Sequence, residues 1–185
     1  IAESLRFLRN EDRESRLDAV VMGLTAEMLV VAGIEPDQSR ALEKVDAAVT
    51  SGRALEIFQK MVTALGGPSD FCDRPDDHLS AAPVIKPIYG SGVLTAMDTL
   101  AIGNSVIELG GGRRRVGEAL DLSVGFSDFA TIGTRLDHET PLAVVHAANE
   151  ADVEKVTGLV LDACTTSEEA PAERPVVVER LTGNS

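Results

Sequence analysis

Residues 99–126 read "TLAIGNSVIELGGGRRRVGEALDLSVGF", and the order of the parts in this stretch decides the fold. Apolar residues at helical spacing run to Leu109, three glycines and three arginines follow, and β-rich stretches come after them. A phosphate-cradling loop lies between a strand and the start of a helix, where free N–H groups face the anion. Here the helix precedes the glycines, so Gly110 falls at a left-handed C-cap. The stretch therefore predicts a capped helix end in an α+β fold and no nucleotide-binding loop.

The three arginines leave two interpretations open. Cations are favourable near a helix C-terminus, which is the negative end of the helix dipole. Three adjacent arginines are more than a cap needs, and they can also reach an acidic neighbour or a phosphate. The candidate ligand-contacting loop consists of Gly111, Gly112, Arg113, Arg114 and Arg115.

Upstream of this stretch, residues 1–80 are expected to be helical throughout. Apolar spacing predicts helices over 1–9, from a cap at Asn10 or Asp12 to Gly33, within 35–52, and over 53–66. The second of these is apolar nearly all round in its later half, which predicts a central position. The first has no capping residue ahead of Ile1, so the chain is expected to be a piece of something longer.

Downstream, short apolar runs alternate with turn residues. Two runs around Tyr89–Gly92 predict a hairpin, and Asp98 and Asn149 are expected to cap helices over 99–109 and 150–164. Further strands are expected within 119–126, 129–136, 141–148 and 175–181. A change of composition at 75–82 predicts a boundary, with a helical segment at 1–80 and a mixed α+β domain at 81–185.

Composition excludes several classes of function. The 185 residues carry a net charge of -13 with 3% aromatics and no Trp, which argues against a nucleic-acid surface. The two cysteines, Cys72 and Cys164, are far apart in no metal spacing and are expected to be buried, reduced thiols of a cytosolic protein. No apolar run reaches membrane-spanning length, and no secretory signal opens the chain.

No complete active site can be assembled from the residues. His78, His138 and His146 are scattered, and His146 is interpreted as a satisfied core histidine. The Ser127-Asp128 pair is interpreted as a turn. No Ser-His-Asp order or metal-ligand spacing is found.

The turn and strand pattern of residues 132–147 is similar to that of the small sandwiched barrels of biotinyl and lipoyl carrier domains. A carrier needs an exposed lysine at a hairpin tip. Lys86 lies between Ile85 and Pro87, and Lys155 lies inside the last predicted helix, so a carrier role is not expected.

Several stretches resemble one family, the thymidine and pyrimidine-nucleoside phosphorylases. Residues 107–147, "IELGGGRRRVGEALDLSVGFSDFATIGTRLDHETPLAVVHA", are similar to its C-terminal domain. Residues 91–103, "SGVLTAMDTLAIG", residues 16–34, "RLDAVVMGLTAEMLVVAGI", and residues 58–71, "FQKMVTALGGPSDF", agree with the same family. The bacterial thymidine phosphorylase branch looks most similar.

This resemblance implies a pentosyltransferase of nucleoside salvage. Phosphate attacks the sugar C1 of thymidine and releases thymine and 2-deoxyribose 1-phosphate. Family members are cytoplasmic homodimers that use phosphate as co-substrate and no cofactor. From the composition and the residue spacing, no nucleic acid, membrane or metal partner is expected either. Their site lies in a cleft between a small helical and a large mixed domain, and the loop at 110–117 is expected near that cleft.

The resemblance also shows a departure. The family holds phosphate with a glycine-rich Lys/Ser segment, and Ser51-Gly52-Arg53 lacks that continuation. The chain is therefore expected to be the closing helices of the larger α/β domain followed by a barrel-sandwich-like α+β domain. It should not catalyse alone, and its own oligomeric state is left open. Alternatives are a phosphorylase of other pyrimidine nucleosides or nucleoside monophosphates, and a standalone barrel-sandwich binding module.

Overall fold

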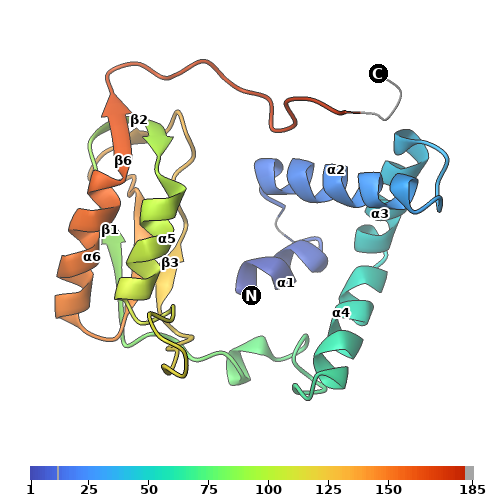
Figure 1. Ribbon diagram of the computed structural model, residues 1–185, viewed down its shortest axis with the longest axis horizontal. Coiled ribbons are helices and arrows are strands. Elements are labelled where there is room, and N and C mark those ends of the chain that lie inside the picture. The colour runs from blue at the N-terminus through green and yellow to red at the C-terminus, as the bar shows by residue number, and fades with distance from the viewer. Residues whose placement is uncertain (12, 182–185) are drawn as a thin grey trace. The chain divides into compact units, whose positions relative to one another are not determined.

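The computed structural model describes residues 1–11 and 13–181, which fold as two compact units (Figure 1). The first unit contains residues 1–78 and the segment that begins at Arg174. The second contains Leu79–Glu173. The domain limits expected from the sequence, 1–80 and 81–185, stay a prediction.

The first unit is helical. Its elements are α1 (Ala2–Leu8), α2 (Ser15–Val31), α3 (Gln38–Thr50), α4 (Arg53–Ala64) and a 3-10 turn at Pro75–Asp77. The cap predicted for α2 at Asn10 is wrong, because the Glu14 carboxylate accepts the N–H groups of Arg16 and Leu17. Asn10 instead adopts a left-handed conformation just after α1. The alternative cap, Asp12, lies outside the described residues.

The central position expected for α2 is also wrong within the described residues. Helices α2 and α3 pack through Ala26 and Ala41, which are fully buried. The opposite stripe of α2 stays open, since Leu24, Met28 and Val31 are all more than half exposed. One helical neighbour covers one face of an apolar helix, so the sequence pattern alone overestimated its burial.

The second unit mixes helices and strands, which confirms the predicted α+β class. Its elements are β1 (Val84–Ile88), β2 (Gly92–Met97), α5 (Thr99–Glu108), β3 (Gly125–Ser127), β4 (Arg135–Leu136), β5 (Ala143–Ala147), α6 (Glu150–Asp162) and β6 (Cys164–Ser167). The strands form two antiparallel three-stranded sheets, with orders β1-β5-β3 and β4-β2-β6. Among the described residues the two sheets form no closed barrel, so the expected barrel-like form is not found.

The hairpin predicted around Tyr89–Gly92 is wrong. Strand β1 pairs with β5, whereas β2 pairs with β4 and β6, so the segment between them carries the chain from one sheet to the other. Gly92 has a φ of 87°, which suits this abrupt change of direction. The amide of Leu142 donates to the carbonyl of Ile88, which keeps the end of β1 with its distant partner. Pairings over long sequence separations thus prevail over the local turn signal.

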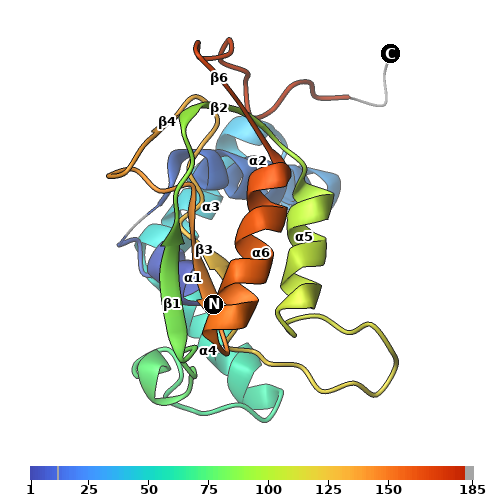
Figure 2. The same ribbon diagram turned by 90° about the vertical axis from the view of Figure 1, so that its left-hand side faces the viewer.

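Helices α5 and α6 run side by side against the strands of this unit (Figure 2). Asp98 and Asn149 cap them as predicted, each accepting backbone N–H groups of the first turn. Val156 and Val160 of α6 are fully buried against Ile88 and Val145, and they form the centre of the core. The core fixes both helices, and with them the loop that leaves the end of α5.

The strand expected within 175–181 is not formed. The segment is irregular, and Val178 and Leu181 are more than four-fifths exposed. Arg180 donates twice to the carboxylate of Glu27, and these hydrogen bonds connect the segment to α2 within the first unit. An apolar run becomes a strand only where another strand offers its free N–H and C=O groups.

Candidate functional site

The glycine segment after α5 is a complete helix stop. The N–H of Gly110 donates to the carbonyl of Ile107, and the N–H of Gly111 donates to that of Val106, both over 3.0 Å. Gly110 has a φ of 94°. This double pattern is the Schellman motif, which satisfies carbonyls at the end of a helix. The predicted capped helix end is therefore present.

Close packing leaves no room for a side chain at the next two glycines. A Cβ at Gly111 would lie 2.9 Å from Cγ1 of Val106, and one at Gly112 would lie 2.6 Å from Cγ1 of Ile107. The chain therefore passes directly over the last turn of α5, where a side chain at either position would force its neighbour to move.

The arginines that follow are held by two glutamates. Arg114 forms an ion pair with Glu108, the last residue of α5, at 2.6 Å. The Glu118 carboxylate accepts the backbone N–H groups of Arg114 and Arg115, and Nε of Arg113 donates to the Glu118 carbonyl at 3.1 Å. The arginines thus meet an acidic neighbour, one of the two partners the sequence suggested, and the loop is folded around Glu118.

Glu108 is shared between the loop and α6. Nζ of Lys155 donates to its second carboxylate oxygen, while Arg114 holds the first. The hydrogen bond from Lys155 lowers the pKa of the Glu108 carboxyl below its ordinary value; desolvation opposes this shift, and the charge of Arg114 adds to it. A single carboxylate therefore connects α5, α6 and the arginine loop.

The arginines do not line the concave surface beside this loop. A hollow of about 590 Å³ is lined by Ser80, Gly110 and residues 119–123. Its one charged lining residue is Asp121, whose pKa is lowered by hydrogen bonds from the hydroxyl and the N–H of Ser123. A hollow with this charge does not attract phosphate, so anion binding by the loop requires the arginine side chains themselves.

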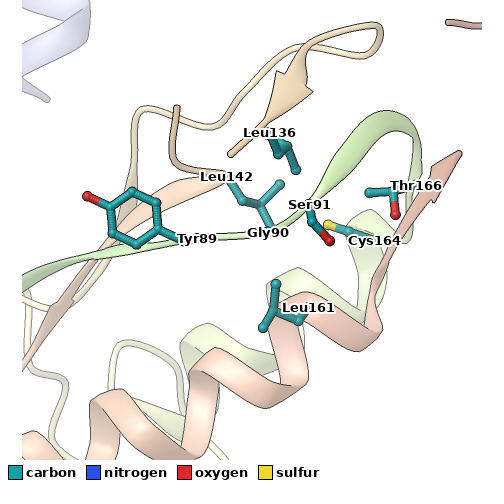
Figure 3. A pocket seen from close by; sticks show the side chains of 8 residues that line it. All are labelled: Tyr89, Gly90, Ser91, Leu136, Leu142, Leu161, Cys164 and Thr166. Atoms are coloured by element: carbon teal, nitrogen blue, oxygen red, sulfur yellow. The ribbon is translucent and has the colours of Figure 1, made fainter. Parts of the chain in front are cut away.

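A second hollow, of about 390 Å³, lies where the chain passes between the two sheets (Figure 3). Figure 3 shows Leu161 of α6 directed toward the segment at Tyr89–Ser91, with Cys164 and Thr166 of β6 beside it. No charged residue lines it. Leu161 is 36% exposed at this opening.

A hydrogen-bonded chain of polar residues escaped the sequence analysis. Oγ of Ser127 donates to Oδ2 of Asp128 at 2.7 Å and lies 2.9 Å from Nε2 of His146. His146 is therefore satisfied as expected, although it projects from the face of β5 opposite the buried Val145. In a catalytic triad the carboxylate contacts the histidine and the serine donates to it. Here the serine hydroxyl donates to the carboxylate and not to the histidine, so these three residues are not arranged to activate a nucleophile.

The remaining candidates are accounted for by ordinary contacts. Lys86 pairs with Glu150, and His78 lies 2.9 Å from Asp70. Residues 1–11 and 13–181 contain no cluster of three or more His, Cys, Asp and Glu side chains able to hold a metal ion. Both cysteines are free thiols; Cys72 is buried, whereas Cys164 is only partly so.

Within the part of the chain that the structure describes, every helix is too short or too polar to cross a membrane.

Comparison with protein families identifies one part of the second unit. Residues 93–167 match the family model of the pyrimidine nucleoside phosphorylase C-terminal domain. The match starts in β2, ends in β6 and includes the arginine loop with Glu108, Glu118 and Lys155. The match confirms, over these residues, the resemblance to the C-terminal domain of this family of pentosyltransferases.

Proposed function

We propose that this chain is part of a thymidine phosphorylase. The observation that carries the proposal is the family match over residues 93–167, joined by the similar stretches at 16–34 and 58–71. In the proposed reaction an oxygen of inorganic phosphate forms a bond to C1 of the sugar as the bond from C1 to the pyrimidine nitrogen breaks. The base leaves with the bonding electrons and takes up a proton, giving thymine and 2-deoxyribose 1-phosphate.

The proposal assigns no catalytic residue to this chain. The described residues contain no nucleophile and base in productive order, and the one hydrogen-bonded Ser, His and Asp chain points its proton away from histidine. The residues that bind the nucleoside and make the main contacts to the phosphate are therefore proposed to lie outside these 185. The chain contributes a packed domain and the basic loop, with Arg114 as the group proposed to reach phosphate.

The deciding experiment is phosphorolysis by the protein that carries these residues together with the phosphate-binding segment of the family. Thymine should be released from thymidine only when phosphate is present, and the 185-residue chain alone should release none. Release without phosphate would contradict the assignment. A preference for uridine or for a nucleoside monophosphate would move the protein to a related phosphorylase of the same family.

A second test concerns the loop. Replacing Arg114 with Ala should raise the phosphate KM of the complete enzyme several-fold while the thymidine KM stays near its original value. The reason is that a guanidinium supplies charge and paired donors for phosphate but none for a neutral base. An unchanged phosphate KM would return the loop to plain helix capping.

The proposal includes the setting of the enzyme. The complete enzyme is proposed to use inorganic phosphate as co-substrate with no organic cofactor. It is proposed to act on a pyrimidine nucleoside in the cytoplasm and to bind neither nucleic acid nor membrane. The complete enzyme is proposed to be a homodimer. Sedimentation of the complete protein and of the 185-residue chain would show whether the dimer needs residues outside this chain.

A further inference from the structure

We propose that Glu108 is a latch that holds the arginine loop against α5, and that Lys155 makes its release easy. The inference rests on the proposed function in one respect, since the proposed reaction supplies phosphate, the ligand for which Arg114 is released. The latch itself concerns contacts within the second unit. It makes Glu108 a positioning residue, which acts through Arg114 and touches no substrate.

The placement of Glu108 is unusual for a helix end. It is the last residue of α5, where the helix dipole is negative and a cation is the favoured neighbour. A carboxylate there is unfavourable unless cations surround it, and it has two, Arg114 and Lys155. The site thus contains one negative and two positive charges, and one of the cations belongs to the loop.

The strength of the contact suits a latch. The side chains of Arg114, Lys155 and Glu108 are 52%, 50% and 31% exposed, so water weakens each pair. Exposed ion pairs of this kind are stabilising by no more than a modest amount, and loops held by them open readily. When Arg114 moves away, Glu108 remains paired with Lys155, so its negative charge still has a partner.

The loop is arranged so that Arg114 can move while its base stays fixed. Glu118 holds the backbone N–H groups of Arg114 and Arg115, and this contact is independent of the Arg114 guanidinium. The Schellman turn at Gly110 fixes the other end. Rotation of one side chain therefore transfers a guanidinium from Glu108 to an incoming anion, with phosphate as the anion of the proposed reaction.

Trypsin reports the state of the loop directly, because Arg113, Arg114 and Arg115 provide three adjacent cleavage sites. In the 185-residue chain, Glu108→Gln should speed cleavage at these sites by about two- to fivefold, the factor that corresponds to losing one exposed ion pair. Lys155→Gln should slow it or leave it unchanged, because Arg114 then has the carboxylate to itself. Cleavage is followed by mass spectrometry of the fragments ending at 113–115.

A matched control is available on α6. Glu150 forms a surface ion pair with Lys86, which is not part of the loop, so Glu150→Gln should leave cleavage at 113–115 unchanged. Equal rates for Glu108→Gln and the original chain would refute the latch. Faster cleavage in both Glu108→Gln and Glu150→Gln would also refute it, because it would indicate general loosening of the unit.

Phosphate separates the latch from the proposed function. In the complete enzyme, millimolar inorganic phosphate should slow cleavage at the loop, compared with potassium chloride of equal ionic strength, and should do so at lower concentration in Glu108→Gln. Faster cleavage of that variant with no phosphate protection in either form supports the latch and contradicts the role of Arg114 in phosphate binding. Phosphate protection that is independent of residue 108 overturns the latch and leaves the proposed function standing.

Discussion

Replacing Gly110 with Ala tests the structural basis of the loop. Gly110 has a φ of 94°, and a Cβ placed on it would meet no atom within 4 Å. The cost of alanine is therefore conformational and not steric, about 1–2 kcal/mol for an L residue in left-handed backbone. The unfolded alanine chain has less entropy, which returns about 0.4–1 kcal/mol. A net destabilisation of about 1 kcal/mol is expected, or about 4–8 °C for a unit of this size.

The same helix supplies a control of opposite sign. Gly103 lies in the interior of α5, and a Cβ there also meets nothing within 4 Å. Alanine at this helical position should stabilise the unit by about 0.5–1 kcal/mol. Asparagine at position 110 should cost less than alanine, because asparagine tolerates left-handed backbone.

The assay must read the second unit alone. Thermal unfolding followed by hydrogen exchange in peptides from α5 and α6 meets this need, since both helices belong to that unit. The order of stability should be Gly103→Ala, the original chain, Gly110→Asn and Gly110→Ala. If Gly110→Ala matched Gly103→Ala, the left-handed C-cap would have no energetic role and the account of the loop would be wrong.

Three further predictions concern the core, acidity and the thiols. Leu142→Ala should destabilise the second unit by about 2–5 kcal/mol because Leu142 is fully buried, whereas Leu122→Ala, at 88% exposure, should change it by less than about 0.5 kcal/mol in urea titrations. Hydrogen bonds from the N–H groups of Glu139 and Thr140 lower the pKa of Asp137. The contribution of this carboxylate to stability is therefore present above the ordinary aspartate pKa and is lost as the pH falls through the lowered pKa. On acidification, the urea midpoint should drop less in Asp137→Asn than in the original chain, and equal drops would contradict this. Burial raises the pKa of the Cys164 thiol, so iodoacetamide should modify it slowly at neutral pH and quickly in urea; fast native labelling would show that the thiol is more accessible than the structure indicates.

Local signals in the sequence identified the helices of the second unit well. Asp98 and Asn149 are short polar side chains just ahead of apolar periodic stretches, and each caps the predicted helix. Gly110 ends α5 as expected. These features depend on hydrogen bonds within a few residues, so neighbouring sequence is enough to predict them.

Contacts between distant residues were not predicted. The runs on either side of Tyr89–Gly92 looked like partners, yet β1 pairs with β5, and β2 pairs with β4 and β6, all far along the chain. An apolar run shows that a strand buries one face, but it does not name the neighbouring strand. The same reason explains why the run at 175–181 was expected to be a strand.

The candidate site shows the same division. The capped end at Gly110 was expected, and an acidic neighbour was one of two partners suggested for the arginines, but the sequence did not indicate which carboxylate. Glu108 and Arg114 are six residues apart across a tight turn, and Lys155 comes from a different helix. The contact of Ser127 with His146 likewise required the pairing of β3 with β5. A single sequence offers no signal for such contacts between distant residues.

The direction of α5 determines how this segment can meet an anion. At the start of a helix, backbone N–H groups bind phosphate without any side chain. At the end of α5 the N–H groups of Gly110 and Gly111 are already used by the Schellman turn, and the dipole repels an anion. Binding must then come from guanidinium groups, and Arg114 is occupied by Glu108 until something with more negative charge competes for it. A dianionic phosphate meets this condition, whereas a neutral nucleoside does not. Nucleoside alone should therefore leave tryptic cleavage at 113–115 unchanged in the complete enzyme, and protection by thymidine without phosphate would show that the loop responds to closure of the enzyme and not to charge.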